Sequence, residues 1–189
     1  MMDDFFPETE ESTIGNYAPD FEIPGINKEV YHLGTHLKKF KAIAVVFMSN
    51  DTPGVDNYIE RLKQIQTEFE SQGFTVIGID SNYRDEPIAK SFESMTGLAQ
   101  KYDLNFPYLR DPTQDVAKSF MVQVMPTVFL LDNQAVIRYA GRIDDSPESV
   151  DGVKNHYLRD SIASVLAGKN LTTDYIEPVG SPIVWRPKN

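Results

Sequence analysis

The chain has 189 residues, no cysteine and a formal net charge of −10 at pH 7. The lack of cysteine excludes disulfides, cysteine-ligated metals and thiol nucleophiles, and the acidic charge argues against binding to the phosphate backbone of a nucleic acid. Hydrophobic residues make up 41% of the chain and charged residues 24%, a composition typical of one soluble globular domain.

The N-terminal segment, residues 1–13, contains five acidic side chains and no basic one, so we expect a solvated tail. The alternative is a docking segment in which Phe5 and Phe6 are the apolar anchors. The segment lacks the basic start and the apolar core of a secretory signal. No apolar run approaches the roughly 20 residues that span a bilayer. We therefore predict a cytoplasmic protein without a membrane span.

The first strong pair of elements is a buried strand followed by a helix. The run AIAVVF within Lys41–Met48 predicts a buried strand. A helix is expected over Pro53–Ser71, with Thr52 as its N-cap and Pro53 in its first position. Apolar residues recur there at helical spacing and should face the sheet; they are Tyr58, Leu62, Ile65 and Phe69.

The rest of the chain continues the alternation of strands and helices. Asp132-Asn133 predicts a hairpin between two late strands, and Gly168 predicts the end of the last helix. The expected strands are Phe74–Asp80, Phe106–Leu109, Thr127–Leu131 and Ala135–Ala140. The expected helices are Pro87–Tyr102, Thr113–Phe120 and Tyr157–Leu166.

This order predicts an α/β domain over residues 14–169, followed by an extended C-terminal tail over residues 170–189. The first two strands, joined through a helix, should be parallel with a right-handed crossover. The late hairpin should add antiparallel strands. The expected result is a mixed central sheet with helices on both faces.

Several short motifs add a family resemblance that covers about Ile14 to Trp185. The motifs are Ala18-Pro19-Asp20-Phe21, the segment Phe47–Val55, Asn105-Phe106-Pro107-Tyr108-Leu109, Met125-Pro126-Thr127, Gly141-Arg142-Ile143-Asp144-Asp145, Leu166-Ala167-Gly168-Lys169 and Gly180–Trp185. In their order and spacing they resemble the thioredoxin-like, redoxin-type branch of the alkyl hydroperoxide reductase and thiol-specific antioxidant superfamily, in which Phe47–Val55 is the active-site segment. This resemblance implies a thioredoxin-like fold.

The departures from the family pattern fall on the residues that carry its chemistry. Ser49, Thr52 and Ser181 occupy the positions of the family's three cysteines, and Asp51 replaces a histidine. The resemblance implies disulfide exchange or peroxide reduction, but thiol exchange needs a thiolate, and Ser and Thr cannot form a mixed disulfide. We therefore expect no thiol redox chemistry and no cofactor.

A hydroxyl nucleophile at Ser49 is the alternative, and it would need a general base. His32, His36 and His156 are the only imidazoles, and none is near Ser49 in sequence. Asp51 is close, but a carboxylate is a weak base. We instead interpret Ser49 and Thr52 as residues that satisfy backbone groups at the strand-to-helix turn.

No metal site is expected. Asp51, Asp56 and Glu60 lack the regular spacing of a calcium loop. Asp144 and Asp145 are expected to form an ion pair or a turn network with Arg142. No catalytic role is assigned to Asp80-Ser81-Asn82, at the end of a strand.

The resemblance also implies a shallow groove that binds an extended protein segment beside a cis-proline, by strand addition. On this hypothesis the chain is a redox-inactive binding protein. A competing interpretation is that Met125 only fills space under the helix. The second functional hypothesis is an enzyme with an unconventional, cysteine-free mechanism. The oligomeric state stays open. The expected groove residues are Asn50, Asp51, Pro53, Met125, Pro126, Thr127 and Arg142.

Overall fold

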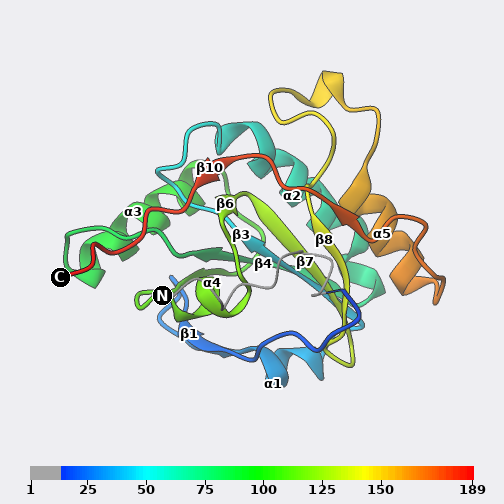
Figure 1. Cartoon of the computed structure of the whole chain (residues 1–189), viewed down its shortest axis with the longest axis horizontal. Helices are drawn as coiled ribbons and strands as arrows, with labels where there is room; N and C mark the ends of the chain where they lie inside the picture. The colour runs from blue at the N-terminus through cyan, green and yellow to red at the C-terminus, as the bar shows by residue number, and fades with distance from the viewer. Residues whose placement is uncertain (1–13) are drawn as a thin grey trace, which may run out of the picture.

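A six-stranded mixed sheet forms the centre of the protein in a computed structural model that describes residues 14–189 (Figure 1). Its strand order is β5-β4-β3-β7-β8-β9. The six strands are β3 (Ala42–Phe47), β4 (Phe74–Asp80), β5 (Tyr108–Arg110), β7 (Thr127–Asp132), β8 (Ile137–Gly141) and β9 (Tyr175–Ile176). Two small antiparallel pairs lie outside it, β1 (Glu22–Pro24) with β2 (Val30–His32) and β6 (Val124–Met125) with β10 (Ser181–Pro182).

Helices cover both faces of this sheet (Figure 1). One face packs against α2 (Asp56–Phe69), α3 (Ile88–Lys101) and α5 (Tyr157–Leu166), and the other against α1 (Leu33–Leu37) and α4 (Asp115–Ser119). Two short 3-10 helices, η2 (Glu70–Gln72) and η3 (Val150–Gly152), complete the helical elements that the structure describes.

The alternation of side chains along β3 explains the two cores. Because successive side chains of a strand point to opposite faces, Ala42, Ala44 and Val46 join the core under α2. Ile43, Val45 and Phe47 join the core on the opposite face. The apolar run is therefore buried on both sides, as a central strand of a mixed sheet requires.

The predicted topology is confirmed in its main features. β3 and β4 are parallel, and β7 and β8 form the antiparallel late hairpin. The predicted mixed sheet with helices on both faces is present. Element ends differ by a few residues, since β5 begins at Tyr108 rather than Phe106 and β8 begins at Ile137 rather than Ala135.

The start of α2 corrects the sequence-based prediction. The helix begins at Asp56, not at Pro53, and its N-cap is Val55. Gly54 has a φ of +81°, a left-handed conformation that a helix cannot contain. A tight turn therefore separates Pro53 from the helix.

The C-terminal tail is an integral part of the fold. β9 adds a parallel strand beside β8, and β10 then pairs antiparallel with β6. The Ile183 side chain is buried. The Val184 backbone N–H donates to the Asn82 side-chain carbonyl oxygen at 2.9 Å. In Figure 1 the tail, orange to red, runs from α5 past β10 towards α3.

Among residues 14–189, no helix is long and apolar enough to cross a membrane. The predicted cytoplasmic location stays a prediction. The expectation of a solvated or docking segment over residues 1–13, including Phe5 and Phe6, lies outside the described residues.

Candidate functional site

A cluster of buried polar residues lies where the parallel strands end. Ser49 follows β3, Asp80 is the last residue of β4, and Arg110 is the last residue of β5. The carboxyl ends of parallel strands meet at one edge of a sheet, which brings these three residues together. All three are buried, Ser49 and Asp80 completely. The position of the family's first cysteine is thus sealed from solvent.

Asp80 is the centre of this cluster. Its carboxylate accepts hydrogen bonds from Arg84 Nη2 at 2.7 Å, from Arg110 Nη1 at 3.1 Å and from the Asn82 backbone N–H at 3.0 Å. Asp51 accepts from Arg84 Nε at 3.0 Å. Two carboxylates therefore face two guanidinium groups, and their formal charges cancel. Sequence analysis missed Arg110 because only the alignment of β4 with β5 places it beside Asp80. It also missed Arg84, which follows Asp80 by four residues in the next loop.

The Ser49 hydroxyl is held by side chains of the same cluster. It donates to the Asp51 carboxylate, lies 3.3 Å from Asp80 Oδ2 and accepts from Arg84 Nη2 at 3.0 Å. Its one backbone partner is the Asp51 N–H, at a long 3.5 Å. The expectation that Ser49 serves backbone groups therefore needs correction, since side chains are its main partners.

The electrostatics of the cluster do not activate this hydroxyl. Burial raises the pKa of the Asp80 carboxyl, and the charges of Arg84 and Arg110 oppose that shift. Burial acts on Asp51 in the same direction, but its hydrogen bonds outweigh burial and hold the pKa of this carboxyl below its ordinary value. The two carboxylates beside the hydroxyl disfavour a negative charge on its oxygen, and the Arg84 guanidinium, 3.0 Å away, opposes them. The cluster as a whole therefore supplies no net positive charge to activate the hydroxyl.

The imidazoles lie elsewhere. His32 Nε2 is 2.7 Å from Asp20, and His36 Nδ1 contacts the His32 carbonyl oxygen at 3.0 Å. His156 lines a separate pocket. No imidazole in the described part of the chain contacts Ser49, so the hydroxyl has no general base of the kind that serine nucleophiles use.

Thr52, at the position of the second cysteine, does not have the predicted role. Its Oγ1 is buried without a hydrogen-bond partner, and it does not cap α2. The physical reason is the turn at Gly54, which moves the start of the helix beyond the reach of this side chain.

The segment before β7 contains the expected cis peptide bond, between Met125 and Pro126. Met125 is 1% exposed, and its side chain belongs to the core on the α1 and α4 side of the sheet. The residue also contributes to the lining of a pocket beside Pro126. Its backbone pairs with Ser181 in β10. The strand edge that the resemblance assigns to a partner is therefore occupied by the chain's own tail.

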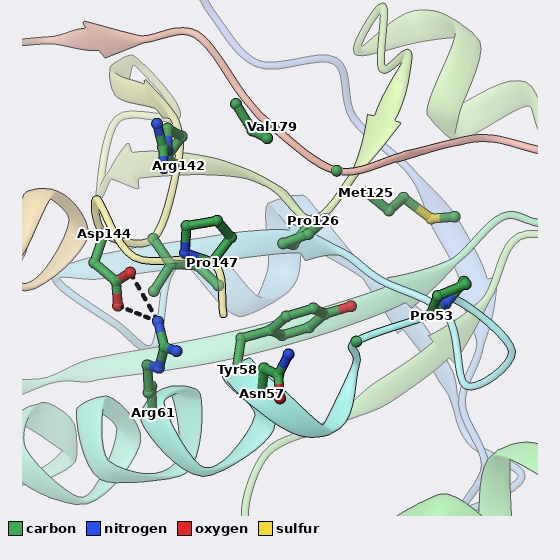
Figure 2. Close-up of a pocket in the computed structure, with 13 residues that line it drawn as sticks. Pro53, Asn57, Tyr58, Arg61, Met125, Pro126, Arg142, Asp144, Pro147 and Val179 are labelled. Carbon is green, nitrogen blue, oxygen red and sulfur yellow. Dashed lines mark hydrogen bonds and ion pairs between the residues drawn. The ribbon is translucent and has the colours of Figure 1, made fainter. Parts of the chain in front are cut away.

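A pocket of about 180 Å³ lies beside this paired edge (Figure 2). Its lining comes from the turn before α2, the first turn of α2, the cis-proline turn, the loop after β8 and the tail. The residues are, in that order, Pro53, Tyr58, Pro126, Arg142 and Val179. A single water needs about 15 Å³, so the pocket is large enough to hold a side chain.

The expected ion pair or turn network at Asp144 and Asp145 is present, but Arg142 takes no part in it. Asp144 accepts two hydrogen bonds from Arg61 Nη1, each 2.8 Å long. Asp145 accepts from the Lys154 backbone N–H at 2.9 Å. Among the described residues, the Arg142 guanidinium forms no hydrogen bond or ion pair. Arg61 precedes Asp144 by 83 residues, a separation that hides the pair from local sequence patterns.

The predicted groove residues do not form one surface. Pro53, Met125, Pro126 and Arg142 all contribute to the pocket of Figure 2. Thr127 is buried, and its hydroxyl donates to the Val124 carbonyl at 2.7 Å. Asn50 and Asp51 line a separate, open depression beside α3. Sequence analysis missed Tyr58, Arg61 and Val179 as pocket residues, and it placed Tyr58 only in the core.

Metal binding has no support in the described residues, since no group of three or more His, Asp or Glu side chains is placed to hold an ion in residues 14–189. The Asp80 cluster is satisfied by guanidinium groups instead.

Comparisons with protein families and solved structures identify proteins that are similar to this chain. The family model described as "AhpC/TSA family" matches residues 14–140. The crystal structure of a hypothetical protein from Sinorhizobium meliloti 1021 has a TM-score of 0.85 and 30% identity, and the match covers 93% of this chain and 96% of that chain.

Two further similarities connect the chain to thiol-disulfide proteins. Thiol-disulfide oxidoreductase ResA of Bacillus thuringiensis subsp. konkukian is 23% identical over 133 residues, which are 70% of this chain and 72% of that protein. The thioredoxin domain of a thiol-disulfide oxidoreductase from Bacteroides vulgatus has a TM-score of 0.56 at 18% identity, over 66% of this chain and 84% of that domain. The predicted thioredoxin-like fold is confirmed.

Proposed function

Because this chain belongs to the AhpC/TSA family but contains no cysteine in its 189 residues, we propose that it has no thiol redox chemistry and binds an extended segment of another protein. The partner's segment lies across the pocket between the start of α2 and the loop after β8. This site differs from the edge expected from the sequence, because β10 already occupies that edge.

The first part of the proposal follows from the chemistry of the three substituted positions. Disulfide exchange proceeds through a thiolate and a mixed disulfide, which Ser49, Thr52 and Ser181 cannot form. Ser49 is also completely buried and fixed by Asp51 and Arg84. A buried cluster of charged side chains thus surrounds the position at which the family has a reactive thiol.

One observation carries the binding part of the proposal. The segment Val124–Met125 already pairs with an extended segment, Ser181–Pro182, and a pocket beside this pair stays open. An extended chain is therefore compatible with the geometry of this surface. Binding of extended peptides by backbone pairing, with pockets for alternate side chains, is a common mode of recognition and requires no cysteine.

The enzymatic alternative, an antioxidant or thiol-oxidoreductase relative with a cysteine-free mechanism, has less support. Ser49 lacks an imidazole base, and neighbouring carboxylates oppose an oxyanion. Turnover assays with hydroperoxide plus a thiol reductant, with insulin disulfides and with simple esters decide between the two. Activity that disappears in Ser49→Ala would establish the enzyme.

The charge of the chain favours a protein partner over a nucleic acid. A net charge of −10 repels a phosphate backbone. We propose the cytoplasm as the compartment in which this binding function operates.

The binding proposal is tested by selecting a library of random, cysteine-free peptides on the immobilised protein. Val179→Arg places a long charged side chain in the lining of the pocket and should abolish binding. This variant is immobilised as the negative control. Val184→Arg is its matched control, because both valines lie in the tail and are 52% exposed, but Val184 does not line the pocket. Sequences should be enriched on the wild type and on Val184→Arg, and not on Val179→Arg. Equal enrichment on all three targets would contradict the proposal.

A further inference from the structure

Gln114, the residue before α4, joins the C-terminal tail to the domain through its side chain, which is 2% exposed. Its Nε2 donates to the Ser81 carbonyl oxygen at 2.8 Å and to the Val184 carbonyl oxygen at 2.9 Å. Its Oε1 accepts from the Arg186 backbone N–H at 2.9 Å. An amide nitrogen has two hydrogens to donate, so both are used. Two of the three bonds hold the tail.

The backbone of Gln114 is left-handed, with a φ of +67°. Such a conformation is uncommon for a residue other than glycine, and it persists only where the surrounding structure determines it. The Gln114 side chain does not cap α4, although it stands at the N-cap position. Its hydrogen bonds therefore serve the tail and the end of β4 rather than its own helix.

The other contacts of the tail with the domain are few in kind. Within residues 177–189, all of which the structure describes, Ile183 is the only buried side chain. Val184 donates its N–H to the Asn82 side chain at 2.9 Å, and its carbonyl oxygen also accepts from the Tyr83 N–H at 2.8 Å. The β10–β6 pair is two residues long. Because a short pair is marginal by itself and segments with little buried surface open easily, the tail depends on its bonds at Val184.

The tail also forms one wall of the pocket beside Pro126. Val179 and Gly180 line the pocket from the tail. In Figure 2, Val179 lies on the tail ribbon, across the pocket from Tyr58 of α2. Gly180 leads directly into Ser181 of β10. When the tail leaves the domain, the pocket loses this wall.

We propose that Gln114 is a positioning residue for the pocket, because it holds the strap, residues 179–186, which detaches and reattaches as one unit. In the attached state Val179 and Gly180 complete the lining, and in the detached state the pocket cannot enclose a side chain. Gln114 is not a lining residue, so it controls the site from outside. Only the effect on peptide binding rests on the proposed function.

The substitution Gln114→Glu tests this role with almost no change of shape. A carboxylate can still accept from the Arg186 N–H, but it faces the Ser81 and Val184 carbonyl oxygens with no hydrogen to donate. The strap should therefore detach at neutral pH. Burial beside these oxygens should raise the pKa of the introduced carboxyl above its ordinary value of about 4.3. Protonation then restores one donor and should reattach the strap.

The charged groups around position 114 leave this expectation unchanged. Asp111 is buried nearby, and its carboxylate adds to the repulsion of a second negative charge. Asp115 and Lys118 are exposed on α4. The Arg186 guanidinium lies over the Tyr83 ring, 5.5 Å from its centroid.

Trp185, the only tryptophan of the chain, lies between the two residues that Gln114 holds and reports on the strap. It is 40% exposed when the strap is attached, so detachment should raise the rate constant for acrylamide quenching of its fluorescence about twofold. Gln114→Glu should show this rise at about pH 7.5 and lose most of it by about pH 5. Gln134→Glu is the matched control, because it adds the same charge in the exposed turn between β7 and β8. Its quenching should equal that of the wild type at both pH values.

A second pair of variants does not alter any buried side chain. Arg186→Pro removes the N–H that Gln114 accepts, at an exposed residue, and Lys188→Pro makes the same change two residues further on. Arg186→Pro should raise Trp185 quenching at both pH values, and Lys188→Pro should not. In both Gln114→Glu and Arg186→Pro, the NMR amide signals of the pocket residues Val179, Gly180 and Arg142 should shift, while those of β3 and β4 stay in place.

Three results would overturn the inference. They are quenching in Gln114→Glu equal to that of the wild type, a rise that is the same at both pH values, and detachment that leaves the pocket signals unchanged. A selected peptide should also bind Gln114→Glu at least about tenfold more weakly at about pH 7.5. Unchanged peptide binding with a detached strap contradicts the inference alone. A wild type that binds no peptide contradicts the proposed function alone, since quenching and the amide signals still decide the role of Gln114.

Discussion

Ser181 of the C-terminal tail pairs antiparallel with Met125, the residue before the cis-proline. The resemblance places a cysteine at the first of these positions and a partner chain beside the second. In this protein the serine is part of a strand that covers the edge. The tail is therefore a structural element of the site as well as of the fold.

The close approach of the tail to Met125 depends on Gly180. A Cβ atom at this position would overlap the Met125 carbonyl oxygen. Gly180→Ala should therefore push β10 off β6 and lower the free energy of unfolding by about 1–3 kcal/mol. Urea denaturation measures this loss.

A second glycine provides a control of opposite sign for that experiment. Gly97 lies exposed within α3, where an added Cβ would meet nothing within 4 Å. Gly97→Ala should raise the free energy of unfolding by about 0.5–1 kcal/mol. Equal effects of the two substitutions would show that the tail does not need Gly180.

Asp80 should be the most sensitive polar position in the protein. Asp80→Asn leaves Arg84 and Arg110 without their buried counter-charge, and removing one partner of a buried pair costs about 3–5 kcal/mol. Asp85→Asn, a nearby exposed site, should stay within about 0.5 kcal/mol of the wild type. Denaturation midpoints compare the two variants. A loss below about 1 kcal/mol for Asp80→Asn would mean that the two arginines find other partners.

A cysteine introduced at position 49 should be inaccessible to thiol reagents. In Ser49→Cys, complete burial protects the thiol from reagents in the solvent. A thiol-specific reagent should modify it at least about tenfold more slowly than an exposed thiol in Ser71→Cys. Rates measured with and without denaturant test this. Equal rates under native conditions would show that the site opens readily.

The acid sensitivity of the protein should depend partly on Asp145. Hydrogen bonds from the backbone of Lys154 and Asn155 lower the pKa of Asp145 from 3.8 to about 2. A carboxyl with a lowered folded-state pKa contributes stability above the unfolded-state pKa and loses it as the pH falls through the folded-state value. The wild type should therefore lose stability between about pH 4 and pH 2 more steeply than Asp145→Asn. Urea titrations across this range compare the slopes, and parallel curves would contradict the assignment.

Local patterns in the sequence predict much of the fold. The apolar run of β3 and the helical spacing of Tyr58 and Leu62 fix the strand and the buried face of α2, because burial follows the period of each element. The cis peptide bond before Pro126 is predicted only by the resemblance to the family. Side-chain preference alone predicts Thr52 as an N-cap, and the left-handed conformation of Gly54 overrides that preference.

The missed parts of the site depend on contacts between distant segments. The Arg61–Asp144 pair spans 83 residues, and the pairing of Ser181 with Met125 depends on the path of the tail around the sheet. Arg110 reaches Asp80 only because β4 and β5 align in parallel, whereas Arg84, four residues after Asp80, depends on the path of the loop. The sequence identified the substituted cysteine positions but not the buried charges that surround them.

The most direct test of a binding function without thiols is a calorimetric titration of one selected cysteine-free peptide into the wild-type protein, Val179→Arg and Val184→Arg. The account predicts a saturable dissociation constant that is the same with and without a thiol reductant, at least about tenfold weaker in Val179→Arg and unchanged in Val184→Arg. An affinity that is equal in all three proteins, or no saturable binding to the wild type, would contradict it.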